Sequence, residues 1–254
     1  MTADFTISKY AELCTSMLIS DYRILTFSEY IEGKGDNHDR FIILRHDVDR
    51  KPFQSLKMAK LERKLGIQST YYFRYPFTFL PNILREVRDL GHEIGYHYEV
   101  LSKTNGDFDK AIKLFNYELT KFREICDIKT ICMHGQPISK YDNKAIWDHY
   151  DFADFGLKGE GYLSISKDID YFSDTGRSWS GKNSLRDFLP GKEPRFAIAD
   201  TDQLIRFLKD KKACKIYILS HPERWASNKL EWCQSYLQDL VFNSGKRALG
   251  VIRG

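Results

Sequence analysis

Strand-like and helix-like runs alternate along this sequence from about residue 40 to its end, and this alternation constrains the fold more than any other feature. The runs FIILRHD (41–47) and IQSTYYFR (67–74) are short, apolar and typical of buried strands. Between them, QSLKMAKLERKLG places its apolar residues near helical spacing and ends on a glycine that suits a helix C-terminus. This order predicts an α/β fold in which helices cover a parallel sheet.

The same order of helix and strand recurs further along the chain. The predicted helices are 81–91, 107–125 and 201–212, and the strands that follow them are 92–99, 129–135 and 215–222. Between residues 140 and 195 only one strand, near DFADFGL (151–157), is indicated. No glycine-rich nucleotide-binding motif occurs, so a barrel of seven or eight strand–helix units is favoured over an open nucleotide-binding sheet.

Composition and charge indicate one domain over residues 1–254 and exclude several classes of partner. The 254 residues are 42% hydrophobic, which is enough for one large core. Lys and Arg number 39 and Asp and Glu 35, without a long run of one sign, so neither nucleic acid nor an anionic membrane is an expected partner. No run approaches the roughly 20 apolar residues that span a bilayer. Five scattered cysteines without a C-x-x-C pair favour a reducing, cytoplasmic location, and nothing in the sequence indicates the oligomeric state.

Four predicted strands end in side chains that bind metal ions or transfer protons: Asp47 with Asp49, His97, His134 and His221. In α/β barrels the C-terminal ends of the strands meet at one mouth, so these residues are expected to lie together. Asp47 and Asp49 are two residues apart on a strand and therefore share a face. Each feature alone also fits a turn, a helix cap or a core residue, and the prediction rests on their conjunction.

The residue types indicate what such a cluster would do. Two adjacent carboxylates resist joint ionisation, and a divalent cation relieves the repulsion if one of them binds it. The other carboxylate is then free to accept a proton from water. Imidazole and carboxylate ligands suit Zn²⁺, Co²⁺, Ni²⁺ or Fe²⁺ better than Mg²⁺ or Ca²⁺. Arg45 shares the inward face of Asp47 and needs a buried partner, for which Glu93 is the expectation.

Several segments resemble the NodB-homology polysaccharide deacetylases, carbohydrate esterase family 4, and within them the divergent branch associated with O-antigen and capsule gene clusters. EVRDLGHEIGYHYE is similar to the segment that carries the G-H-E-I-G-x-H motif of this family, and ILRHDVD stands where the family has T-F-D-D-G or a D-x-D variant. LERKLGIQSTYYFR and YILSHP resemble its second strand and its closing L-x-H motif. The resemblance covers residues 41–225, which are the expected core of the domain.

This resemblance implies a distorted (β/α)7 TIM-like barrel and metal-dependent removal of an acetyl group from an N-acetylated sugar or glycan precursor in surface polysaccharide synthesis. Zn²⁺ is the metal expected first. By resemblance, Asp47 is the catalytic base, Asp49 and His97 are metal ligands, and His221 protonates the departing amine.

The sequence also departs from the family pattern. The second motif of the family is usually H-x-x-x-H, but Leu101 stands four residues after His97. His134 is expected to supply the missing ligand, with Glu99 as the competing candidate. The usual R-x-P motif is absent as well, so either Arg45 or Arg177 is expected to hold the base.

Trp179 and Trp225 are expected to offer stacking faces to sugar rings. The missing ligand leaves two alternatives to the deacetylase. One is a non-catalytic barrel that binds a glycan or a partner, and the other is a hydrolase of a different C–N amide bond.

Overall fold

The computed structural model describes residues 3–136, 138–181, 186–191 and 193–253, with side chains up to residue 245. The strands are β1 (Arg23–Leu25), β2 (Phe41–Val48), β3 (Thr70–Phe73), β4 (Glu93–Tyr98), β5 (Thr130–Met133), β6 (Gly159–Glu160), β7 (Asp170–Ser173) and β8 (Lys215–Ser220). The helices are α1 (Ile7–Ile19), α2 (Phe27–Ile31), α3 (Pro52–Lys64), α4 (Pro81–Asp89), α5 (Val100–Lys103), α6 (Phe108–Arg123), α7 (Thr201–Lys209) and α8 (Lys229–Arg253). Short 3₁₀ helices form at η1 (Asn143–Asp148), η2 (Phe152–Phe155) and η3 (Pro222–Arg224).

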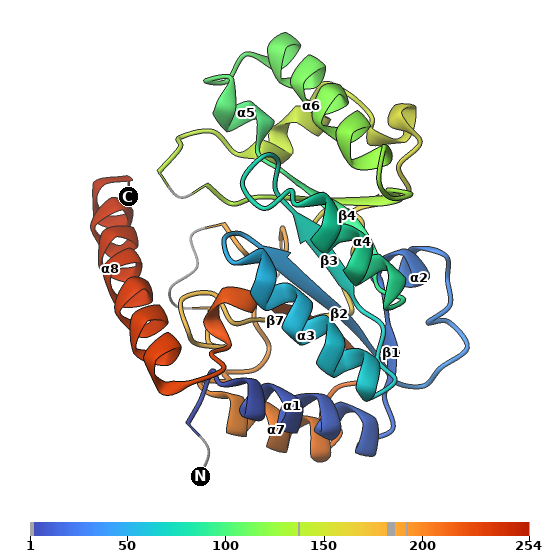
Figure 1. Ribbon diagram of the computed structural model, residues 1–254, viewed down its shortest axis with the longest axis vertical. Coiled ribbons are helices and arrows are strands. Elements are labelled where there is room, and N and C mark those ends of the chain that lie inside the picture. The colour runs from blue at the N-terminus through green and yellow to red at the C-terminus, as the bar shows by residue number, and fades with distance from the viewer. Residues whose placement is uncertain (1–2, 137, 182–185, 192, 254) are drawn as a thin grey trace.

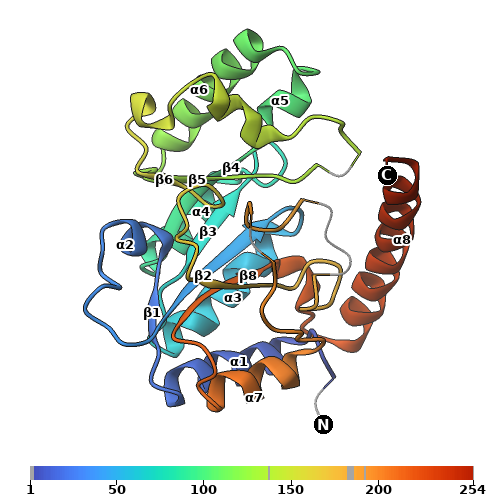
Figure 2. The ribbon, with the colours of Figure 1, turned by 180° about the vertical axis from the view of Figure 1, so that it is seen from behind.

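All described strand pairs are parallel, and seven strands follow one another in the order β6-β5-β4-β3-β2-β8-β7. The eighth, β1, pairs with the first half of β2 on the edge that β3 occupies further along. Among the described residues no pairing joins β6 to β7, so the curled sheet stays open at that seam (Figures 1 and 2). The predicted barrel-like α/β fold is thus confirmed, with its distortion located at this seam.

Side chains rather than backbone hydrogen bonds bridge the open seam. The Tyr217 hydroxyl on β8 donates to the carbonyl oxygen of Gly161, just after β6, at 3.1 Å. A side chain at position 161 would collide with the Arg45 guanidinium and with Cys132, so glycine is needed there. The inside of the barrel is therefore packed.

The buried side chains form two clusters, and residues of β2 contribute to both. The first lies inside the barrel and beneath α4, α5 and α6, and the second packs β2, β7 and β8 against α1, α3 and α7. In Figure 1, α1 and α7 run together along the bottom of the molecule, while α5, α6, η1 and η2 form its top. An opening remains at the C-terminal ends of the strands, where residues just after β2, β3 and β5 line a cavity.

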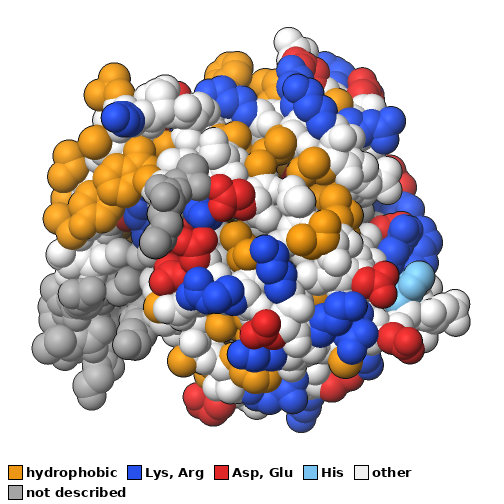
Figure 3. Space-filling model, turned by 90° about the horizontal axis from the view of Figure 1, so that it is seen from below, with side chains coloured by type: hydrophobic (Ala, Val, Ile, Leu, Met, Phe, Trp, Pro, Cys, Tyr) orange, Lys and Arg blue, Asp and Glu red, His pale blue; other side chains and the backbone are white. Residues whose placement is uncertain are grey.

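Helix α8 lies along the side of this opening and outside the expected core of residues 41–225 (Figures 1 and 2). The helix exposes apolar side chains on one face, among them Leu230, Leu237 and Val241. Figure 3 shows apolar side chains gathered on the side of the molecule where α8 lies, whereas charges of both signs intermingle elsewhere on that view. No helix in the described part of the chain is both long enough and apolar enough to cross a bilayer.

The helix ends agree with the sequence, but one strand prediction is wrong. Gly66 and Gly91 follow α3 and α4 with φ of +74° and +95°, a conformation that favours glycine. The strand expected near residues 151–157 is instead η2, because Asp151 caps the backbone N–H of Ala153 at 2.8 Å and starts a helical turn. Phe152 and Phe155 then point together toward Trp147.

Candidate metal and catalytic site

The structure brings the two aspartates after β2 against the histidine of β4. Every residue of β2 is buried, and Asp49 follows directly after its end. The His97 Nε2 atom lies 3.3 Å from Asp49 Oδ1 and 3.7 Å from Asp47 Oδ2. The other ring nitrogen, Nδ1, lies 3.0 Å from the Cys132 carbonyl oxygen, which can only accept a hydrogen bond. His97 therefore carries a proton on Nδ1 and directs Nε2 at both carboxylates.

His134, just after β5, approaches the same carboxylate from another side. Its Nε2 atom lies 3.6 Å from Asp49 Oδ1, and its ring centre lies 5.2 Å from that of His97. The His134 Nδ1 atom lies 2.9 Å from Glu99 Oε2, so Glu99 orients the ring. Arg74 holds Glu99 in turn with two hydrogen bonds of 2.9 and 2.8 Å. Because Glu99 already accepts from both side chains, His134 is the better candidate for the third ligand.

The protonation of these groups reflects their mutual contacts. Burial raises the pKa of the Asp49 carboxyl, but three surrounding imidazoles outweigh it and hold that pKa well below its ordinary value. Burial lowers the pKa of His97, but Asp47 and Asp49 outweigh it, so this pKa is raised. For His134 burial prevails and the pKa is lowered, which favours the neutral imidazole that a metal requires.

His221, directly after β8, is held by a buried aspartate that the sequence analysis missed. Asp174 Oδ1 lies 2.6 Å from His221 Nδ1, and Asp174 also accepts from the His221 backbone N–H. The His221 Nε2 atom faces the site, 4.0 Å from Asp49 Oδ2. Burial and Arg224 lower the pKa of His221, but the carboxylates of Asp174 and Asp49 outweigh them and raise it. Asp174 follows β7, a short strand without a clear apolar pattern, and this is why it was not found.

The expected partner of Arg45 is wrong. The Arg45 side chain is fully buried, with Nη2 3.6 Å from Asp47 Oδ2 and the guanidinium 4.5 Å from the ring centre of Tyr162. Glu93 lies in register with Arg45 across the sheet, but Thr70 on the intervening strand donates to Glu93 at 2.6 Å, and Thr130 donates to it as well. Arg45 is thus the arginine that contacts Asp47.

Three other residues are also placed differently from the expectation. Arg177 does not hold the base, because it pairs with Asp239 of α8 at 3.4 Å. Trp179 and Trp225 are only 3% and 0% exposed, so neither offers a free face to a sugar. Both indoles pack within the cluster beneath α1 and α7, and Trp179 donates to Thr201 at 2.9 Å.

The residues around Asp49 fit a divalent cation. Asp47 Oδ1 and Asp49 Oδ1 are buried oxygen atoms that have no hydrogen-bond partner in the described part of the chain. A buried carboxylate oxygen is costly unless a proton donor or a metal compensates it. Asp49, His97 and His134 supply one carboxylate and two imidazoles, which are ligands that Zn²⁺ accepts.

A second set of possible ligands overlaps with the first. Within the described residues, Asp47, His97 and Cys132 are the set whose ligand atoms all lie within 4.8 Å of one another, and the set of Asp49, His97 and His134 is more widely spaced. However, burial raises the pKa of the Cys132 thiol well above its ordinary value, and Sγ contacts the Arg45 guanidinium. Arg45 lowers this pKa, but burial outweighs it and keeps the thiol neutral, so the set around Asp49 is preferred.

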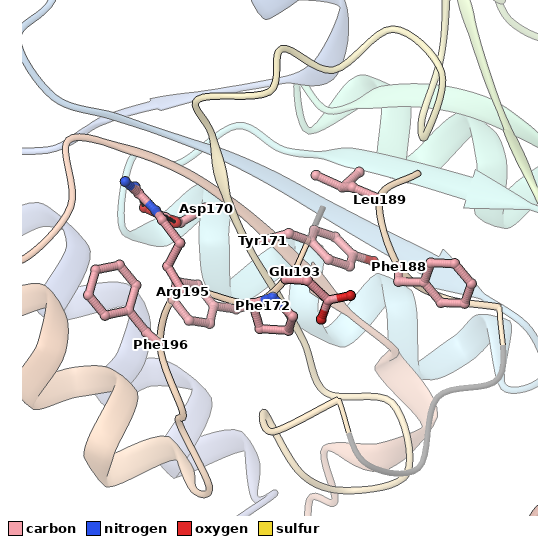
Figure 4. Close-up of a pocket in the computed structure, with 9 residues that line it drawn as sticks. Asp170, Tyr171, Phe172, Phe188, Leu189, Glu193, Arg195 and Phe196 are labelled. Atoms are coloured by element: carbon pink, nitrogen blue, oxygen red, sulfur yellow. Dashed lines mark hydrogen bonds and ion pairs between the residues drawn. The ribbon is translucent and has the colours of Figure 1, made fainter. Parts of the chain in front are cut away.

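Two cavities differ sharply in their chemistry. One of about 160 Å³ is lined by Asp49, His134 and Arg74 together with Arg50, Arg224 and three residues of α8, namely Asp239, Phe242 and Asn243. Another of about 60 Å³ lies beside β7, where Figure 4 shows the Arg195–Asp170 pair among phenylalanine rings. The cavity of about 160 Å³ is the candidate site, because Asp49 and His134 line it.

Neither a protein-family model nor a curated protein matches the sequence, but several solved structures are similar. The CE4 domain of a multidomain xylanase from the hindgut metagenome of Trinervitermes trinervoides has 13% identity and a TM-score of 0.44, over 80% of this chain and 83% of that chain. A CE4 esterase from Streptococcus mutans has 12% identity and a TM-score of 0.47, over 89% of each chain. A CE4 family pseudoenzyme from Bacillus anthracis has 14% identity and a TM-score of 0.43, over 80% and 61%.

Proposed function

We propose that the protein is a metal-dependent hydrolase that removes the acetyl group from an N-acetylated sugar or glycan precursor. The observation that carries the proposal is the position of Asp49 Oδ1, which lies 3.3 and 3.6 Å from the Nε2 atoms of two histidines. The Nδ1 atoms of both rings face acceptors, so their Nε2 atoms converge on a carboxylate that a cation would neutralise. The sugar substrate, its use in surface polysaccharide, a cytoplasmic location and Zn²⁺ as the metal are parts of this proposal that come from the sequence resemblance and the ligand types.

Each residue of the site has a role in this reaction. Asp49, His97 and His134 would hold the cation, whose chemistry is to make water more acidic and to stabilise negative charge on the acetyl oxygen. Asp47 accepts the proton of the attacking water, and the Arg45 guanidinium 3.6 Å away balances its charge. Protonated His221 donates its Nε2 proton to the departing amine nitrogen, and Asp174 favours that protonated form.

Two variants test the division of these roles. Asp47→Asn removes the proton acceptor but keeps its shape, so acetate release should stop while metal binding persists. His97→Ala should lose both acetate release and metal binding. Equal loss of metal in the two variants would contradict the assignment. The assay substrates are N-acetylated sugars. If the protein releases no acetate from them but cleaves other amides, the alternative function, hydrolysis of another C–N bond, is supported.

The non-catalytic alternative rests on Leu101, which is 2% exposed in the core at the position where a histidine ligand was expected. Thermal unfolding with and without added Zn²⁺ or Co²⁺ separates the two functions. Cation binding at a hundredfold excess over the dissociation constant stabilises a protein by about 2.7 kcal/mol, which is roughly 5 to 10 °C for a chain of this size. A protein without bound metal and without this shift would be the inactive barrel.

A further inference from the structure

The C-terminal helix forms one wall of the candidate site, outside the segments that resemble a known family. Residues 235, 239, 242 and 243 have helical spacing on the inner face of α8. Ser235 donates to the Glu223 carbonyl at 2.9 Å, and Asn243 donates to the Gly176 carbonyl at 3.0 Å. Both acceptors belong to the loops after β8 and β7, so the helix is attached to the same loops that carry His221 and Asp174.

Asp239 fixes the position of this helix. Its carboxylate is 4% exposed and lies 3.4 Å from Arg177, 3.8 Å from Arg50 and 3.8 Å from Arg224. Removal of such a buried partner would leave several cations uncompensated, so a shift of α8 along its axis is costly. Arg50 immediately follows Asp49, and the helix is therefore anchored next to the proposed metal ligand.

Phe242, one turn beyond Asp239, is an exposed aromatic ring at the wall of the cavity. Its side chain is 52% exposed, and the Arg50 guanidinium lies 4.9 Å from its ring centre. The ring lines the cavity of about 160 Å³ together with Asp49 and His134. Arg50 holds the ring from one side, and the exposed part of the ring remains available for a ligand.

We propose that Phe242 of α8 is the stacking platform for the sugar ring of the substrate. This inference rests on the proposed deacetylase function and assigns to Phe242 the role that the sequence analysis expected of Trp179 and Trp225. The C–H face of a pyranose packs on an aromatic ring, while its hydroxyl groups require polar partners at the edge. Asn243 and Arg74 line the same cavity and carry polar groups. A substrate bound there would lie against Asp49 and His134.

Binding measurements test the platform independently of turnover. The probes are N-acetylglucosamine, N,N′-diacetylchitobiose, UDP-N-acetylglucosamine and acetanilide, titrated by calorimetry into Zn²⁺-loaded Asp47→Asn protein. Phe242→Ala in this background should weaken the sugar probes by about tenfold, and Phe242→Tyr should restore most of the affinity. Val241→Ala is the matched control, because Val241 is 69% exposed on the opposite face of the helix. Unchanged Zn²⁺ affinity in all variants shows that the site itself is intact.

The outcomes separate this proposal from the proposed function. Sugar affinity that is equal with and without the Phe242 ring, or no binding of any sugar probe at millimolar concentration, would overturn the platform. The platform would also be overturned if loss of the Phe242 ring weakened the binding of acetanilide but not of the sugars. If the sugars bind through Phe242 but Zn²⁺-loaded wild-type protein releases no acetate, the platform stands and the deacetylase function fails. In an active enzyme, Phe242→Ala should raise KM by about tenfold and leave kcat nearly unchanged.

Discussion

Glu99 Oε2 lies 2.9 Å from Nδ1 of His134, and this contact turns the opposite ring nitrogen of His134 toward Asp49. A carboxylate behind a histidine fixes the tautomer and the orientation of the ring. Burial raises the pKa of Glu99, but His134 and Arg74 outweigh it and lower the pKa to about 2. Glu99 is therefore ionised throughout the physiological range and orients the His134 ring.

The first prediction concerns this support. Glu99→Ala should weaken Zn²⁺ binding by about 10- to 100-fold, because His134 loses its orienting acceptor, and Glu99→Gln should weaken it less. The measurement is competition for Zn²⁺ against a chelator of known affinity. Glu62→Gln is the control, because Glu62 is also a buried carboxylate that pairs with a histidine, His46, at 2.7 Å. Equal Zn²⁺ affinity in Glu99→Ala and wild type would show that His134 does not bind the metal.

The second prediction concerns the proton that His221 donates. This histidine must be protonated to act as the acid, so activity should fall as the pH rises through its raised pKa. Asp174→Asn removes a carboxylate that raises the pKa of His221, whereas burial and Arg224, which lower this pKa, still act. The descending limb of the kcat/KM profile should therefore move to lower pH. At neutral pH the variant should lose about a hundredfold in kcat/KM. Asp170→Asn, at the start of β7 and paired with Arg195, should leave the descending limb in place. An unmoved limb in Asp174→Asn would exclude His221 as the acid.

Much of this arrangement follows from the sequence because periodicity and chain direction are local properties. Asp47, Asp49, His97, His134 and His221 all follow or end short apolar runs, and parallel strands bring those ends to one mouth. Their roles as ligands, base and acid remain predictions, but their contacts with one another are present in the structure.

Other features depend on three-dimensional packing that no sequence pattern reports. Asp174 follows a strand of four residues with few apolar neighbours, and its link to His221 spans 47 positions. Trp179 and Trp225 were expected at the site for a similar reason. The sequence does not show whether a tryptophan in a loop region faces solvent or the core, and both indoles are buried. Glu93 does not pair with Arg45, because the hydroxyl groups of Thr70 and Thr130 on neighbouring strands donate hydrogen bonds to its carboxylate.

The third prediction concerns acid stability at a cluster away from the site. Glu62 on α3 is fully buried, lies 2.7 Å from His46 Nε2 and accepts from Ser69 at 2.7 Å and Tyr71 at 2.8 Å. Burial raises its pKa, but His46 and the other partners outweigh it and lower the pKa from 4.5 to about 2. A carboxyl with a lowered folded pKa stabilises the fold above its unfolded pKa, and this contribution is lost as the pH falls toward the folded value.

The contribution of Glu62 should therefore disappear between about pH 4.5 and about pH 2. Its size is on the order of 3 kcal/mol. Urea unfolding across this range measures it: wild-type stability should fall steeply, whereas Glu62→Gln should start lower at neutral pH and fall less. Parallel curves for the two proteins would show that this carboxylate does not control acid unfolding.

The fourth prediction separates the buried tryptophans from the exposed ring of α8. Trp179 is 3% exposed and lies 6.3 Å from Trp225, centre to centre, so Trp179→Ala leaves a large cavity in the core beneath α1 and α7. The free energy of unfolding should fall by about 3 to 5 kcal/mol, whereas KM for N-acetylated sugars should stay the same in the folded fraction. Phe242→Ala should do the reverse, because its ring is half exposed and its removal opens no cavity in the core. If Trp179→Ala left the stability unchanged but raised KM, Trp179 would contact the substrate and this prediction would be wrong.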